Sequence, residues 1–224
     1  MHQGRGVRGM RFISTTLVLS LLAFSLSANA REITIFGGFN YLDTETTQTS
    51  DTGDSGEAPT ALDTVTSGSR TGFGAFVQSF EDDGFYVNAG FQRTDGEYDV
   101  CVVEDCTGVN LTVDDVNVEF GWSRRQWTPF LEFSWSDIES QIPSAFDTET
   151  DLALGIGSWY QFAEDTKIKI KISGLNNGDS QTINAGFQRS LQSYFTIDGS
   201  FTYPLTQDVT GYGFRFAIGW TIQP

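Results

Sequence analysis

The chain has 224 residues, of which 39% are hydrophobic and 14% aromatic, and its formal net charge is −16 at pH 7. The 29 acidic residues against 13 basic ones argue against nucleic acid as a partner, because lysine and arginine make most phosphate contacts. Two cysteines and one histidine are too few for a structural zinc site, which needs four nitrogen or sulfur ligands.

Residues 1–30 have the pattern of a secretory signal peptide. Three arginines and no acid precede an apolar run from Leu17 to Leu26, which is shorter than the roughly 20 residues of a membrane-spanning helix. An Ala-Asn-Ala cleavage pattern follows at 28–30. Translation starts at Met1 or Met10, and either start gives a mature domain over 31–224 with 10 basic residues, 29 acidic residues and no histidine.

From residue 31 onward, apolar residues alternate with small or polar residues, and this period of two predicts β-strands. We expect ten of them, an even number, as closed bacterial outer-membrane barrels have. The apolar faces run over Ile33–Tyr41, Phe73–Val77, Phe85–Phe91, Val116–Trp122, Trp127–Trp135, Leu152–Tyr160, Ile168–Ile172, Ile183–Phe187, Phe195–Tyr203 and Tyr212–Ile222.

The expected connections alternate between short and long, as periplasmic turns and extracellular loops do in such barrels. The short ones are Glu81–Gly84, Ser123–Gln126, Ala163–Thr166 and Leu191–Ser193. The long ones are Asp43–Ser69, Asp95–Asn110, Asp137–Thr150, Asn176–Asp179 and Pro204–Thr210.

Alternation alone fits a soluble lipocalin-like barrel as well as a membrane barrel. The polar face of the strands carries few charges, whereas a soluble surface would be about a quarter or more charged, and this favours a lipid-facing exterior. Aromatic residues gather at both ends of the strands, as in interfacial girdles. They are Trp122, Trp127, Tyr160 and Trp220 beside the short turns, and Tyr41, Trp135, Tyr203 and Tyr212 beside the long loops. We therefore predict an all-β, transmembrane, antiparallel up-and-down barrel of about ten strands, with eight as the alternative.

The export signal, the alternating strands, the segment W-T-P-F-L-E-F (127–133) and the final strand resemble the OmpA/OmpX-like superfamily of small outer-membrane β-barrel proteins. The resemblance implies the outer membrane of a Gram-negative bacterium, with membrane lipid and lipopolysaccharide as surroundings. It also implies insertion by the barrel-assembly machinery, whose C-terminal signal Phe216, Ile218 and Trp220 match. The chain departs from the family in two ways. We expect ten strands where the family usually has eight, and residues 221–224 extend past the expected aromatic end.

Cys101 and Cys106 lie in the segment C-V-V-E-D-C. Because export takes the chain to an oxidising compartment, we expect these two cysteines to form a disulfide that ties one long loop.

The lack of histidine in the mature chain excludes Ser-His and Asp-His catalysis. Glu119 and Glu132, on neighbouring polar faces, could form an acid–base pair, but an ion-pair network in the lumen is the favoured interpretation. The inward faces would carry six charged residues near mid-height: Glu119, Glu132, Lys169, Lys171, Asp198 and Arg215. We expect them to pair across the lumen and close it, without enzymatic activity or a cofactor.

Asp51, Asp54 and Glu57 place three carboxylates at a spacing of three among glycines. Oxygen ligands suit calcium and other hard cations, although the spacing is not that of an EF-hand, and a solvated acidic loop is the alternative. The expected role is structural or porin-like. The alternatives are a narrow channel for small solutes or ions, and a surface binding or adhesion module using the acidic loops.

Overall fold

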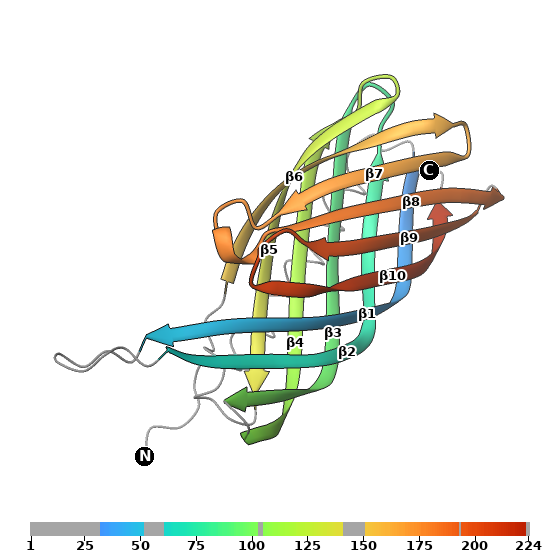
Figure 1. Cartoon of the computed structure of the whole chain (residues 1–224). Coiled ribbons are helices and arrows are strands. Elements are labelled where there is room, and N and C mark those ends of the chain that lie inside the picture. The colour runs from blue at the N-terminus through green and yellow to red at the C-terminus, as the bar shows by residue number, and fades with distance from the viewer. Residues whose placement is uncertain (1–31, 52–60, 103–104, 141–150, 193, 223–224) are drawn as a thin grey trace, which may run out of the picture.

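Antiparallel strands make up nearly all of the described chain (Figure 1). The computed structural model describes residues 32–51, 61–102, 105–140, 151–192 and 194–222, so the predicted signal peptide lies outside the described residues. The strands are β1 (Glu32–Asp51), β2 (Ala61–Phe80), β3 (Phe85–Val102), β4 (Asp105–Trp122), β5 (Trp127–Ser140), β6 (Asp151–Ala163), β7 (Thr166–Ser173), β8 (Thr182–Gln192), β9 (Phe195–Pro204) and β10 (Val209–Ile222). A single 3-10 turn, η1 (Gly178–Ser180), lies between β7 and β8.

The ten strands form one closed barrel in which each strand pairs with its neighbours in sequence and β1 pairs with β10. This confirms the predicted ten-stranded antiparallel barrel and excludes the eight-stranded alternative. Closure gives every strand two neighbours, so backbone N–H and C=O groups in the barrel wall are satisfied without water. No helix in the described part of the chain is long and apolar enough to cross a membrane.

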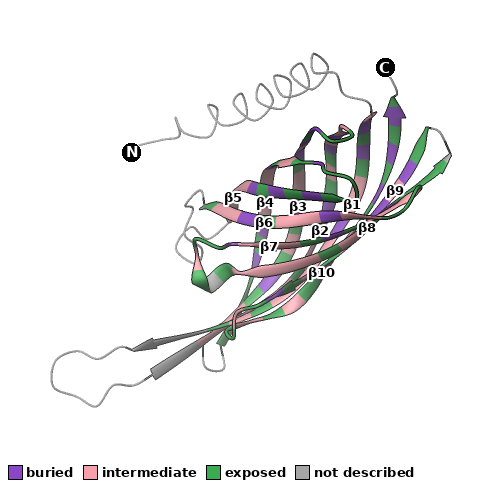
Figure 2. Cartoon of the chain, turned by 90° about the horizontal axis from the view of Figure 1, so that it is seen from above, coloured by how far each residue is buried: buried purple, intermediate pink, exposed green. Residues whose placement is uncertain are grey.

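Most large apolar side chains point outward, and the charged side chains near mid-height point inward. Phe73, Ile170 and Ile218 are 75%, 59% and 55% exposed, whereas Glu119 and Asp198 are buried in the lumen. The alternation of buried and exposed positions can be followed along the strands (Figure 2). An apolar exterior around a polar interior is the arrangement of a transmembrane barrel rather than of a soluble one.

The eight aromatic residues of the predicted girdles are half-buried or exposed on the wall, four beside the short turns and four farther along the strands toward the long loops. Trp127 and Tyr160 are direct partners on β5 and β6, with ring centroids 4.7 Å apart. Toward the opposite end, Tyr41 of β1 and Tyr212 of β10 lie 6.0 Å apart. Aromatic rings at these depths fit the two interfaces of a bilayer.

Three predicted long loops are wrong in extent, because the strands continue into them. The segment predicted as Asp43–Ser69 is strand as far as Asp51 and again from Ala61, and the one predicted as Asp95–Asn110 is strand as far as Val102. Strand β5 likewise runs on to Ser140. Beyond the membrane the outer face of a hairpin meets water and need not be apolar, so the alternation that marks a lipid-facing strand fades while the pairing persists.

The barrel wall is uneven in height. Strands β1 and β2 have 20 residues each and β3 and β4 have 18, whereas β7 has 8 and β9 has 10. The hairpin β1–β2 consequently projects well beyond the short strands (Figure 1). Inside the tall part of the wall, Tyr98, Leu111 and Val113 form a buried apolar cluster against Ile138, which supports the projecting strands.

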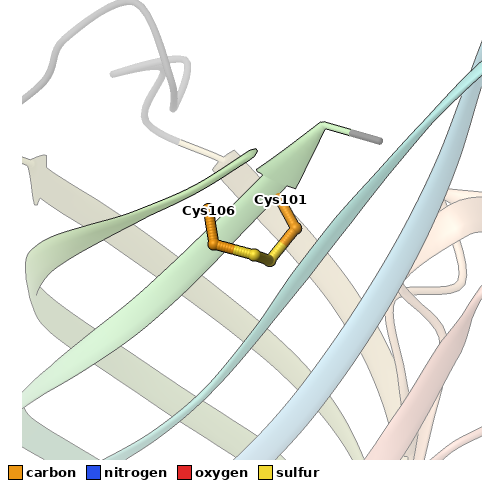
Figure 3. The surroundings of a disulfide bond; sticks show 2 residues. All are labelled: Cys101 and Cys106. Carbon is orange, nitrogen blue, oxygen red and sulfur yellow. A yellow bond between two sulfur atoms is a disulfide. The ribbon is translucent and has the colours of Figure 1, made fainter. Parts of the chain in front are cut away.

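The predicted disulfide is confirmed at the end of the β3–β4 hairpin (Figure 3). Cys101 and Cys106 are direct partners in the β3–β4 register, with Cα atoms 4.0 Å apart. The bond therefore joins two strands that backbone pairing already holds side by side.

We predict that Phe216→Arg destabilises the barrel by about 2 to 4 kcal/mol, since it places a charge in lipid near the middle of β10. The free energy of unfolding in lipid vesicles, measured by urea titration, checks this. Leu205→Arg, between β9 and β10, is the depth control and should cost at most about 1 kcal/mol. Equal costs at both positions would contradict the assigned membrane depth.

We predict that the double variant Cys101→Ser, Cys106→Ser still folds into the closed barrel. Chain entropy for so short a loop gives the disulfide a stabilising effect of about 2 kcal/mol, and the barrel pairing is independent of it. Heat-dependent mobility in a denaturing gel reports folding, and thiol titration of the wild type should find no free cysteine. Failure of the double variant to fold would show that the hairpin needs the bond before it pairs.

Candidate functional site in the lumen

Two glutamates face each other inside the barrel wall. Glu119 on β4 and Glu132 on β5 are direct register partners, and their residues are 0% and 3% exposed. Like charges directly opposite each other on neighbouring strands are destabilising, and burial adds a desolvation cost. This pair therefore requires cations close by.

Strand β7 supplies those cations from two strands away. The Nζ atom of Lys169 lies 2.5 Å from Oε1 of Glu119. Lys171 forms an ion pair with Oε1 of Glu132, and its Nζ atom lies 3.7 Å from Oε1 of Glu119. Lys171 thus sits between the two carboxylates and offsets their repulsion.

Glycines on the intervening strand β6 make this approach possible. A Cβ atom at Gly155 would lie 2.5 Å from Oε2 of Glu132 and 2.9 Å from the Ile172 carbonyl oxygen. At Gly157 the corresponding space is taken by the ring of Phe130. At Gly155 and Gly157 the inner surface of β6 is therefore bare backbone, over which side chains of β5 and β7 meet.

A second ion pair lies on the other side of the lumen, on β9 and β10. The Nη2 atom of Arg215 donates to Oδ1 of Asp198 at 2.8 Å, and its Nε atom donates to the same oxygen at 3.2 Å. The guanidinium carbon lies 4.5 Å from the ring centroid of Phe76, which stacks on Phe36 at 4.3 Å. Arg215 thereby combines a charged partner with a cation–π contact.

All six charged residues predicted for the lumen point inward, and the structure brings them into two pairings on facing walls. They are Glu119, Glu132, Lys169 and Lys171 on one side and Asp198 and Arg215 on the other. The two groups are close enough for Arg215 to interact electrostatically with Glu119. Three acids and three bases leave the cluster with no net formal charge.

A hydrogen-bonded layer that sequence reasoning missed lies beneath Glu119. The hydroxyl of Tyr86 donates to Oε2 of Glu119 at 2.5 Å and accepts a hydrogen bond from the indole N–H of Trp159 at 2.9 Å. The amide of Gln78 donates to the same hydroxyl at 3.2 Å, and Gln188 donates to Gln78 at 2.6 Å. The sequence did contain a signal for this layer. Tyr86 and Trp159 are large aromatic residues at inward positions of β3 and β6, whose neighbouring inward residues are small or polar.

The contacts of Glu119 and Glu132 leave no room for a substrate beside them, which argues against the acid–base interpretation. Both oxygens of Glu119 are occupied, by Lys169 and Tyr86. Those of Glu132 are occupied by Lys171 and by the hydroxyl of Ser173 at 2.5 Å. With all four oxygens engaged and buried, the pair has the arrangement of a structural network.

The predicted cation site is not described as a unit. Asp54 and Glu57 lie outside the described residues, and only the backbone of Asp51, at the end of β1, is described. Within the described residues, no group of three or more His, Cys, Asp or Glu side chains is arranged to hold a metal ion.

Neither a family model nor a curated protein sequence matches the chain. Its fold is similar to solved structures of barrels, including the attachment invasion locus protein Ail of Yersinia pestis, with 12% identity over 86% of this chain and 99% of that one and a TM-score of 0.40. The outer membrane protein OprG from Pseudomonas aeruginosa has 12% identity over 87% and 97%, with a TM-score of 0.42. The translocator domain of the autotransporter NalP from Neisseria meningitidis has 10% identity over 96% of both chains, with a TM-score of 0.43. At these identities the likeness concerns barrel architecture and carries no information on function.

We predict that Lys169→Met destabilises the barrel by about 3 to 5 kcal/mol, because it strips Glu119 of its closest cation in a buried setting. Combining it with Glu119→Gln should recover part of that loss, so the two changes are not additive. Urea unfolding of the two single variants and the double variant measures the coupling. Additive losses would contradict a direct, energetically coupled pair.

Proposed function

We propose that this protein is a non-enzymatic outer-membrane barrel whose lumen is closed near mid-height, and that its role is structural rather than conductive. The observation that supports this most is the set of contacts crossing the lumen. Lys169 of β7 reaches Glu119 of β4, and Gln188 of β8 reaches Gln78 of β2. In the order of strands around the barrel, each contact joins two strands that have at least two other strands between them.

Side-chain volume supports the same proposal. A barrel of ten strands is only slightly wider than the eight-stranded kind that side chains can fill. Large rings occupy its lower lumen: Tyr86, Phe130 and Trp159 are 0%, 3% and 2% exposed and pack as one cluster with Phe80. The plug is therefore an aromatic layer capped by an ion-pair layer.

The proposed location rests on the chain's own surface. The apolar outer face, the aromatic residues at its two ends and the absence of a strand edge among the described strands suit a bilayer. Outer-membrane lipid and lipopolysaccharide would then surround the wall, and the barrel-assembly machinery would insert it through β10. Divalent cations at the acidic loops remain part of this proposal.

Two alternative functions have a structural feature in their favour. A narrow channel is favoured by an open cavity of about 860 Å³ at the short-turn end of the lumen. A surface binding module is favoured by the height of hairpins β1–β2 and β3–β4, which carry acidic side chains such as Glu45, Glu97 and Asp99 away from the barrel. Both are compatible with the fold, and only the channel conflicts with a closed lumen.

Single-channel recording in planar bilayers tests the proposal. The wild type should be silent or show small, rare openings, and Lys169→Ala with Arg215→Ala should increase the conductance. The first change removes the bridge from β7 to β4, and the second removes a long side chain from the opposite wall. Heat-dependent gel mobility verifies that each variant is folded. If that variant does not fold, Glu119→Gln with Lys169→Ala opens the same bridge without leaving a buried charge unpaired.

Asn184→Ala is the matched control for this experiment. Its amide donates to Thr202 at 2.8 Å along the wall, between paired strands, and not across the lumen. This variant should stay as silent as the wild type. A large, steady wild-type conductance that none of these changes affects would overturn the closed lumen and make the channel the leading function.

A further inference from the structure

The cavity at the short-turn end is a defined feature of the molecule, which we call the vestibule. Its walls are the turns between β2 and β3, β4 and β5, and β6 and β7, together with the start of β1. Trp159 and Gln188, which belong to the plug, line its inner end. If the lumen is closed there, the vestibule is a blind pocket, and in bacterial barrels this end faces the periplasm.

The charges around the vestibule are mainly negative. Its lining contains the carboxylates of Glu32, Glu81, Asp82, Glu164 and Asp165. The opposing bases in the lining are Arg125 and Lys167. Asp165 is paired with Arg189 at 3.1 Å, which still leaves an excess of acid, and the whole chain carries a net charge of −16. Such a potential concentrates cations at the opening.

The vestibule wall already holds one alkylammonium group. The Nζ atom of Lys167 lies 3.5 Å from the ring centroid of Phe80, a cation–π distance. Glu32 and Asp82 interact electrostatically with the same ammonium. An aromatic face in a cavity that Glu32 and Asp82 also line is therefore a seat for a primary ammonium, and at present a side chain of the protein fills it.

The polar groups deeper in the vestibule suit the same kind of ligand. The amide nitrogen of Gln188 donates to Gln78, and that of Gln161 donates to the Ala163 and Glu164 carbonyl oxygens. Each of these amides also has an oxygen, which can only accept hydrogen bonds. Oxygens accept from N–H donors, which an ammonium has and a phosphate lacks.

We propose that the vestibule binds a small aliphatic amine or diamine, and that Lys167 is a tethered competitor for its ammonium seat. One end of a diamine would take the seat on Phe80, within the field of Glu32 and Asp82, and the other would reach the amide oxygen of Gln188 at the inner end. That the diamine is retained in a blind pocket rests on the proposed closed lumen. The ammonium seat on Phe80 does not depend on that closure.

Isothermal titration of the folded protein in nonionic detergent with 1,5-diaminopentane tests this inference. The wild type should bind, and Lys167→Met should bind roughly three- to tenfold more tightly because it vacates the seat. Glu32→Gln with Asp82→Asn should weaken binding by a similar factor, since two partly exposed ion pairs are lost. Glu97→Gln with Asp99→Asn, an equal loss of two charges on the β3–β4 hairpin, is the matched control and should leave affinity unchanged.

Three outcomes would overturn the inference: no heat of binding, weaker binding by Lys167→Met, or binding of inorganic phosphate in preference to the diamine. Equal weakening by Glu97→Gln with Asp99→Asn would reduce the effect to general attraction by an acidic protein and would also overturn the inference. Conductance separates this result from the proposed function. A conducting barrel that binds the diamine refutes closure and keeps the site, whereas a silent barrel that does not bind refutes only the site.

Discussion

Pairing of β1 with β10 is the contact on which the whole structure depends. The two strands are paired from Ile33 with Ile222 to Thr46 with Val209, which converts a sheet with two open edges into a closed wall. The seam is reinforced inside, where Thr221 lies within hydrogen-bonding distance of Thr34 on β1, at 2.9 Å, and of Thr196 on β9, at 3.2 Å. Only after closure are all backbone groups of the wall satisfied in lipid, and only then does a confined lumen exist in which side chains from distant strands meet.

Closure also sets the electrostatics of that lumen. A charge inside the ring has little access to water, so each acid must find a base within the same cross-section. The direct opposition of Glu119 and Glu132 would be unfavourable in an open sheet, but the curved wall brings β7 close enough for Lys169 and Lys171 to neutralise both. Gly155 and Gly157 on β6 leave the space through which these lysines reach the glutamates, so the ion pairs depend on the glycines as well as on the lysines.

The wall and its orientation were predictable because the bilayer imposes the same period on every strand. Along β7 and β10 every second residue is apolar because it faces lipid. The residues between them face the lumen, and these include Lys169, Lys171 and Arg215. What the sequence could not show is which inward residues meet, since that depends on strand order and stagger around the ring. Glu119 was predicted as a member of a cluster, but its bonds to Tyr86 and through it to Trp159 follow from positions separated by 33 and 73 residues in the chain.

The same reasoning explains why the projecting hairpins were underestimated and what they imply for function. Thr44 and Glu45 on β1 continue the ladder, but above the lipid neither face is required to be apolar, so the sequence there looks like a loop. The extra height is greatest in β1 to β4, where Tyr98, Leu111 and Val113 give it an apolar support of its own. Because the wall is tall on one side and short on the other, the long-loop end of the barrel is asymmetric. The short-turn end is compact and holds the vestibule. The two ends of this barrel therefore meet their surroundings by different means: a projecting sheet on one side of the membrane and an acidic, aromatic-walled pocket on the other.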